Sequence, residues 1–149
     1  MPMSTSNPRS PNASLTSRFH RLEQRVNLAV LDAVHEAGYE RLGPSHIGFL
    51  DQMGAGCRMG ELANRLNVTP AAVSQLAVQL ETLGLVRRTP DPRDGRAVVV
   101  EPTKEVERGW VVARAAVGGI ESRWRAELGH RRFAALVADI ERLVALDDG

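Results

Sequence analysis

The segment Arg58–Pro102 limits the possible folds of this chain more than any other stretch. It contains two short helical patterns, Met59–Leu66 and a second one that begins at Pro70, separated by a break from Asn67 to Thr69. Two runs of strand-forming residues around a tight turn follow directly. Helix, turn, helix and hairpin in this order is the layout of a winged helix-turn-helix. We therefore predict a mainly α chain with a small β-hairpin wing, of the α+β class.

The second helix has clear sequence signals at both ends. Thr69 is a good N-cap, because its hydroxyl can accept a hydrogen bond from a free N–H group of the first turn. Pro70 follows at the first helical position, where its missing N–H is no loss. Gly84 is expected to end the helix in the left-handed conformation. One apolar face recurs at three- and four-residue spacing, through Val73, Leu76, Ala77, Leu80 and Leu83.

The opposite face of this helix is uncharged, since no charged residue occurs from Asn67 to Leu80. It carries Ala71, Ser74, Gln75, Val78 and Gln79. One interpretation is an ordinary amphipathic helix with a solvated outer face. The other is a recognition helix, in which small residues permit close approach to the major groove and Ser74 and Gln75 face base edges. The helix before it and the hairpin after it favour the recognition helix.

The hairpin concentrates positive charge. Its strands are predicted at Leu85–Arg88 and Arg96–Val100, and the intervening Asp91–Gly95 is dense in turn-forming residues. Its four arginines are Arg87, Arg88, Arg93 and Arg96. A solvated charged hairpin is one interpretation. We favour a wing that contacts phosphates and a groove of DNA, because a helix pair precedes it.

The segment Leu42–Thr103 resembles the DNA-binding domain of the MarR family of bacterial transcription regulators. Three motifs carry the resemblance: E-L-A-x-x-L at Glu61–Leu66, L-E-x-x-G-L-V-R-R at Leu80–Arg88, and D-P-x-D-x-R at Asp91–Arg96. The last is fairly specific, because an ordinary hairpin does not need that order of acids and arginine. The resemblance implies that Asp94 steadies the wing and that Arg96 enters the minor groove.

Four regions are expected along the chain. Residues 1–14, rich in Ser, Pro and Asn, are predicted to be a disordered tail. Residues 15–41 are an N-terminal dimerisation helix, 42–102 the winged helix-turn-helix domain, and 103–149 the C-terminal dimerisation helices. Within these regions we expect helices at Leu15–Ala37, Pro44–Met53, Thr103–Leu128 and His130–Leu146, a bend or close helix contact at Gly118-Gly119, and, as the resemblance implies, a short third strand at Cys57–Met59.

The terminal helices carry more apolar surface than one small domain can cover. The stripe in residues 15–37 includes Phe19, Leu22 and Val26, and both helices after Thr103 have stripes of their own. These helices could pack together as a monomeric bundle. We favour a homodimer, because two-fold symmetry lengthens the site that a short recognition helix can bind. The resemblance implies one dimerisation unit built from both ends of the chain.

Composition limits the cellular setting. The net charge is only +1, so attraction to nucleic acid must come from locally placed arginines. No apolar run approaches a membrane span, and the start of the chain lacks the apolar region of a signal peptide. The single cysteine, Cys57, excludes an intrachain disulfide and fits a reducing cytoplasm. We predict a cytoplasmic protein with no membrane partner.

Motifs of catalysis are missing, so we predict no enzyme, no catalytic residue and no cofactor. Some MarR-family members bind zinc through histidines and carboxylates, and His35, Glu36 and His46 are the residues to consider here. No ligand-spaced cluster exists, so we favour isolated histidines and no metal. Cys57 is interpreted as a small packing residue, with redox sensing as the alternative.

We therefore expect a MarR-type transcription regulator that binds a pseudo-palindromic operator in double-stranded DNA as a homodimer. A small-molecule effector is expected between the dimer helices and the DNA-binding lobe, where it would change half-site spacing. The alternative is a winged-helix protein-interaction module without sequence-specific DNA binding, which the uncharged helix supports and the hairpin arginines oppose. The predicted DNA-binding residues are Thr69, Pro70, Ala71, Ser74, Gln75, Gln79, Arg87, Arg88, Arg93, Asp94 and Arg96.

Overall fold

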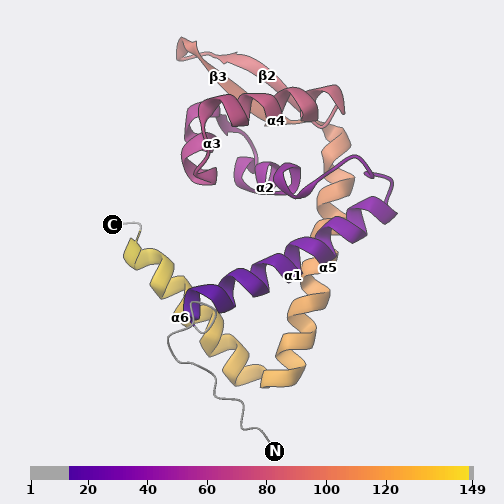
Figure 1. Cartoon of the computed structure of the whole chain (residues 1–149), viewed down its shortest axis with the longest axis vertical. Helices are drawn as coiled ribbons and strands as arrows, with labels where there is room; N and C mark the ends of the chain where they lie inside the picture. Colours follow the sequence, from indigo (N-terminus) through magenta and orange to yellow (C-terminus); the bar gives the residue numbers. More distant parts are fainter. Residues whose placement is uncertain (1–13, 148–149) are drawn as a thin grey trace, which may run out of the picture.

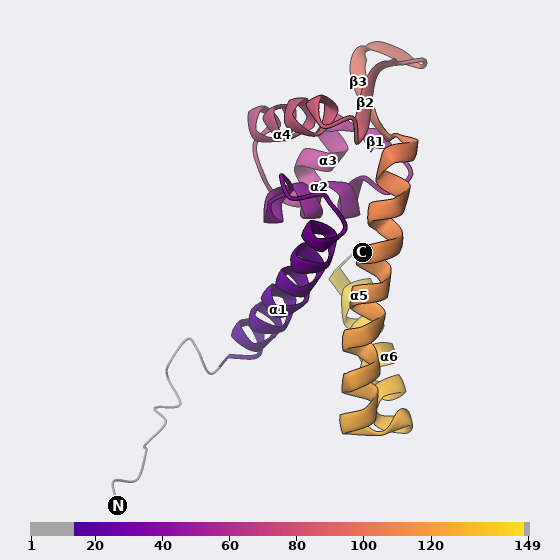
Figure 2. The ribbon, with the colours of Figure 1, turned by 90° about the vertical axis from the view of Figure 1, so that its right-hand side faces the viewer.

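The computed structural model of the chain describes residues 14–147. The predicted disordered tail, residues 1–14, lies outside this range except for Ser14. The Ser14 hydroxyl accepts a hydrogen bond from the Ser17 N–H (3.1 Å) and so caps the first helix. Figures 1 and 2 show a lobe of short helices and a small sheet, with the long helices of the two chain ends outside it.

The lobe contains the helix-turn-helix and its wing. In chain order its elements are α2 (Pro44–Met53), β1 (Cys57–Arg58), α3 (Met59–Leu66), α4 (Pro70–Thr82), β2 (Val86–Asp91) and β3 (Asp94–Pro102). The strands are antiparallel in the order β1-β3-β2, and Val100 of β3 lies between Cys57 and Arg88. The predicted mainly α fold with a small β wing is confirmed, including its short third strand.

The long helices are α1 (Leu15–Glu36), α5 (Lys104–Leu128) and α6 (His130–Asp147). α1 packs against α5, and α6 turns back along the end of α5 after Gly129 (Figures 1 and 2). Phe133 is buried near the start of α6, and the Arg125 guanidinium lies 4.8 Å from the centre of its ring. All six helices agree with the predicted boundaries to within one residue.

The core joins α2, α3 and α4 to the sheet and to the start of α5. Its fully buried side chains include Phe49, Met53, Leu62, Leu80 and Val100. In α4 the predicted apolar face is the buried one: Val73 and Ala77 are fully buried, and Leu76 is half-buried. Each fully buried side chain of Val or Leu size contributes about 1.5–3 kcal/mol relative to its exposed state. Core packing therefore fixes the rotation of α4 about its axis.

Local hydrogen bonds define both ends of α4. The Thr69 hydroxyl accepts a hydrogen bond from the Ala72 N–H at 3.2 Å, and Pro70 is the first helical residue. Beyond the helix, Gly84 has a φ of +73°, the left-handed conformation predicted for it. Thr103, the first residue of the helix predicted at Thr103–Leu128, is the N-cap of α5, but its hydroxyl donates to the Gly84 carbonyl (2.5 Å) and does not cap the helix. The end of α4 is thus attached to the start of α5.

The hairpin turn is tighter than the predicted Asp91–Gly95. Only Pro92 and Arg93 separate the strands, because pairing continues until Asp91 lies opposite Asp94. The register shifts between Pro90 and Asp91. A proline is tolerated there because β2 is an edge strand.

Tyr39 ties the loop after α1 to α5. Its hydroxyl donates to the Glu105 carbonyl (2.9 Å), and the Arg108 guanidinium lies 5.4 Å from the centre of its ring. A Cβ added to Gly109 would lie 3.4 Å from the same ring, so the glycine leaves room for the tyrosine. The α1–α2 loop and the first turns of α5 therefore form one packed unit.

Helix α5 runs unbroken through Gly118-Gly119, where a bend or a close helix contact was predicted. Apart from the helix's own nearby backbone, no atom of the described residues lies within 4 Å of a Cβ built on either glycine. Within residues 14–147 these glycines therefore make no close helix contact. The Ser122 hydroxyl donates to the Gly118 carbonyl (2.8 Å) and leaves the helix intact.

Candidate nucleic-acid interface

Helix α4 presents a solvent-exposed face that carries no charge. All its predicted site residues are exposed, namely Thr69, Pro70, Ala71, Ser74, Gln75 and Gln79. Val78 lies among them and is 47% exposed. Since the opposite face is held in the core, these side chains stay on the outside. The described structure brings together all the residues predicted for the recognition helix.

A groove of about 570 Å³ separates this face from the wing. It is lined by the start of α3, by Ser74 of α4 and by strand residues, and three arginines reach it: Arg58, Arg88 and Arg96. Helix α3 begins here without a side-chain cap, so its first N–H groups add positive potential, which Glu61 in the same turn reduces. Arg58 and Arg88 are ion-paired, whereas Arg96 has no ion-pair partner within residues 14–147, so Arg96 is the arginine of the groove that is free to bind an anionic strand.

Two aspartates shape the tip of the wing. The Asp94 Oδ1 atom accepts a hydrogen bond from the Arg96 N–H (3.1 Å), which holds the backbone that carries Arg96. Asp91 is buried; its Oδ1 atom accepts from the Arg93 N–H (2.8 Å) and its Oδ2 atom from Arg58 Nε (2.5 Å). The Arg93 N–H is the main cause of a lowered Asp91 pKa, and the Arg58 guanidinium adds to it. Asp91 thus joins the wing to the start of α3.

The hairpin arginines fall into two pairs. Arg88 binds Glu81 of α4 (2.7 Å), and this hydrogen bond lowers the pKa of Glu81. Arg87 binds Glu101 (2.9 Å); because successive strand residues point to opposite faces, it lies on the other side of β2 from Arg88 and the groove. Arg93 and Arg96, both exposed, form no ion pair within residues 14–147. The positive charge of the hairpin that has no ion-pair partner in the described residues is therefore at the tip of the wing.

Several residues of this site are not among the DNA-binding residues predicted from the sequence. They are Arg58, Asp91, Glu81, Glu101 and His46. Asp91 opens the D-P-x-D-x-R motif, which is a signal for its role. For the others, tertiary pairing alone reveals the contact. Arg58, for example, is separated from Asp91 by 33 residues.

His35 and His46 have hydrogen-bond partners, and Cys57 is buried. His35 Nε2 lies 2.6 Å from the Leu42 carbonyl, and His46 Nδ1 accepts the Gly43 N–H at 2.9 Å. In the described part of the chain no group of three or more His, Cys, Asp or Glu side chains could hold a metal ion. Cys57 is 8% exposed, and burial raises the pKa of its thiol, which opposes formation of the reactive thiolate.

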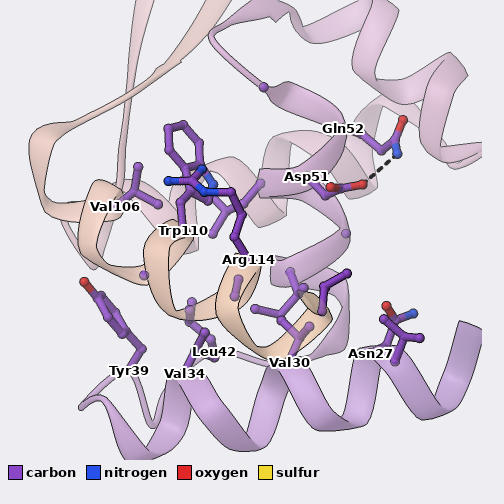
Figure 3. Close-up of a pocket in the computed structure, with 18 of the residues that line it drawn as sticks. Asn27, Val30, Val34, Tyr39, Leu42, Asp51, Gln52, Val106, Trp110 and Arg114 are labelled. Carbon is purple, nitrogen blue, oxygen red and sulfur yellow. Dashed lines mark hydrogen bonds between the residues drawn. The ribbon is translucent and has the colours of Figure 1, made fainter. Parts of the chain in front are cut away.

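A second cavity, about 1120 Å³, lies where α1, α2 and α5 meet (Figure 3). Val30, Val34, Leu42 and Trp110 give it apolar walls, and Arg114 of α5 adds a charge. On the α2 side, the Gln52 amide donates to Asp51 (3.0 Å). The cavity lies between the long helices and the lobe, the region where the sequence analysis expects a small-molecule effector.

The helix pair, the wing and the groove between them define a winged helix-turn-helix protein. Residues 47–97 match the model of the MarR family. The chain is similar to wild-type MarR from E. coli in its apo form, with 20% identity and a TM-score of 0.68 over 87% of this chain and 96% of that one. It is also similar to a probable transcriptional regulator from Pseudomonas aeruginosa, with 20% identity and a TM-score of 0.66 over 90% of this chain and 99% of that one. A third similar structure is YusO from Bacillus subtilis, with 21% identity and a TM-score of 0.59 over 88% of this chain and 92% of that one.

The resemblance to the MarR family is confirmed, and the chain has the fold of MarR-family transcription regulators. The search of curated proteins finds no match. Within residues 14–147, no helix has both the length and the apolar character needed to cross a membrane.

Proposed function

We propose that this chain is a transcription regulator that binds a pseudo-palindromic site in double-stranded DNA as a homodimer. Helix α4 would enter the major groove and the tip of the wing would follow the minor groove. The observation that carries the proposal is the exposed, uncharged face of α4 beside a groove that three arginines reach. Polar but uncharged side chains suit base edges, whereas arginines suit phosphates.

The arginines of the wing are proposed to bind phosphates, whereas the uncharged α4 face is proposed to contact bases. Arg93 and Arg96 are exposed and have no ion-pair partner in the described residues, so they can bind DNA without breaking an internal pair. Two such arginines per subunit give four per dimer, and each neutralised phosphate adds about −0.9 to the salt slope of binding. We expect the two wings to contribute roughly −3 to −4 to this slope.

Dimerisation through α1, α5 and α6 is the second part of the proposal. Large apolar side chains are exposed on these helices in the single chain, among them Leu15, Phe19, Leu22, Val111, Leu136, Leu143 and Val144. Apolar faces of this extent are typical of surfaces that a partner covers. A second copy of the chain would cover them and set the spacing between two α4 helices.

A ligand-responsive mechanism fits the cavity between α1, α2 and α5. Its walls belong both to the long helices and to the lobe. A small molecule that binds more tightly to one relative arrangement of these parts shifts the population toward it. The separation of the two α4 helices, and hence the affinity for DNA, would change with it.

A protein-interaction module is the second candidate. The observation in its favour is that Arg87 and Arg88 are already neutralised by Glu101 and Glu81. Half of the hairpin arginines thus contribute less to an attraction for phosphate than the sequence alone indicates.

One binding experiment separates the two candidates. Fluorescence anisotropy would follow binding to a labelled duplex from upstream of the chain's own coding region, and to a random duplex of equal length, over a salt series. A regulator binds the upstream duplex more tightly, with affinity falling as salt rises. Equal, weak binding of both duplexes would support the interaction module.

A further inference from the structure

His46 connects the start of α2 to the recognition helix. It is the third residue of α2 and is half-buried. Its Nδ1 atom accepts the Gly43 N–H at 2.9 Å, and its Nε2 atom lies 2.7 Å from Oε1 of Gln79 on α4. One imidazole ring therefore contacts both a helix cap and a side chain of the exposed α4 face.

These two contacts fix the direction of each hydrogen bond. A backbone N–H can only donate, so Nδ1 of His46 must be the unprotonated nitrogen that accepts from Gly43. In a neutral imidazole the proton is then on Nε2, which donates to Gln79. The only acceptor of a glutamine side chain is its oxygen. The Gln79 amide is therefore oriented with Oε1 toward α2 and its NH₂ group away from it.

This orientation limits what Gln79 can bind. A glutamine amide that turns freely can accept from N4 of cytosine or N6 of adenine with its oxygen and can donate with its NH₂ group. His46 holds the oxygen of Gln79 toward α2, so the NH₂ group is the end of the amide directed away from α2. In the major groove it can donate to N7 of adenine, to N7 or O6 of guanine, or to O4 of thymine, whereas cytosine offers only a donor.

We propose that His46 is a positioning residue that makes Gln79 a hydrogen-bond donor to a purine or thymine acceptor and disfavours cytosine at the same position. This inference rests on the proposed DNA binding. It separates Gln79 from Gln75, whose side chain forms no hydrogen bond with the rest of the described chain and keeps both ends of its amide free. The two glutamines of α4 then select different bases.

Two substitutions separate the roles of the imidazole. In His46→Asn, the side-chain oxygen can replace Nδ1 as the acceptor for Gly43, but the side chain is too short to reach Gln79. In His46→Gln, the amide nitrogen can replace Nε2 as the donor to Gln79, but the Gly43 contact is lost. The first variant keeps the helix cap and frees Gln79. The second keeps the Gln79 contact.

The experiment is selection of bound duplexes from a random library, followed by sequencing, with the full-length chain and its variants. Gln79→Ala identifies the base position that depends on Gln79, where the discrimination against cytosine should fall about three- to tenfold, the loss expected for one hydrogen bond. At that position His46→Asn should admit cytosine, whereas His46→Gln should keep the wild-type preference. The position identified by Gln75→Ala serves as the internal control and should not respond to His46→Asn.

The outcomes distinguish this inference from the proposed function. If the wild-type chain enriches no sequence, DNA recognition and the role of His46 both fail. If the wild-type chain enriches a site and His46→Asn leaves every position unchanged, only the role of His46 fails. A uniform loss of affinity for all sequences in Gln79→Ala would place Gln79 on a phosphate and would also overturn the inference.

Discussion

Arg96 and Arg87 differ in the charges around them, although they belong to one hairpin. Arg87 is bound to Glu101, whereas Arg96 has no ion-pair partner in the described residues. Arg96→Ala should weaken binding to all duplexes and reduce the salt slope of a dimer by about two, one for each subunit. Arg87→Ala is the matched control and should have a smaller effect. Equal salt slopes for the two variants would contradict the placement of Arg96 on DNA.

Gln75→Ala should produce a different signature. Gln75 is exposed near the middle of α4, and its amide forms no hydrogen bond within residues 14–147. Loss of a bidentate base contact should lower affinity for the specific site by about 1–3 kcal/mol and relax one base preference per half-site. Binding to random duplex should stay nearly constant, as measured by anisotropy over a salt series. A changed salt slope with unchanged base preference would mean that Gln75 contacts the backbone.

Asp91 should make the stability of the fold depend on pH. Its pKa lies below the ordinary value of 3.8, mainly because the Arg93 N–H binds the carboxylate, with Arg58 adding to the effect. The carboxylate therefore stabilises the fold fully above pH 3.8, and this contribution is lost as the pH falls through the lower folded-state pKa. Asp91→Asn should lower the melting temperature at neutral pH, and the difference from wild type should shrink in acid. A difference that is constant across the pH series would exclude the charge as its source.

At the scale of the residue, the sequence predicts the exposure of side chains better than it predicts their hydrogen-bond and ion-pair partners. The exposure of Ser74, Gln75 and Gln79 follows from helical periodicity, because the opposite face must be buried. The pairing of Arg58 with Asp91 and of His46 with Gln79 spans 33 residues in each case. No local pattern encodes such contacts, since they depend on how α2 and α3 pack against α4 and the wing.

At the scale of the element, Thr69 offers a direct test of how α4 begins. Its hydroxyl satisfies the Ala72 N–H, one of the four N–H groups that a helix leaves free at its start. Thr69→Ala should reduce the free energy of unfolding by about 1 kcal/mol, measured by denaturant titration. Thr69→Ser keeps a hydroxyl and should restore most of the loss. If both variants are equally destabilised, the methyl group rather than the cap is responsible.

Helix boundaries were predictable because their signals are local. Thr69, Pro70 and Gly84 each act within one turn of the helix end that they define. The hairpin turn was predicted too long, because turn-forming composition does not reveal that Asp91 and Asp94 pair. Strand pairing is set by the partner strand and by the register shift between Pro90 and Asp91, which composition alone does not specify.

At the scale of the whole molecule, the apolar faces of the terminal helices predict self-association. Sedimentation equilibrium at micromolar concentration should give twice the 16.3 kDa of one chain. Leu136→Asp on α6 should shift the protein toward monomer, because burial of a charge in an apolar interface is costly. Val98→Asp on the wing is the matched control, since the two side chains are 42% and 41% exposed in the single chain. A monomer for the wild-type chain would disprove the dimer.

The hydrogen bond from Thr103 to Gly84 couples the direction of α5 to the end of the α4 segment. A helix of 25 residues is about 37 Å long, and its near end is hydrogen-bonded to the residue that terminates the α4 segment. A sideways shift of about 3 Å at the far end of such a rod corresponds to a rotation of only about 5° at the junction. If α5 turns as a rigid rod about this junction, large displacements near α6 become small changes in the angle of α4.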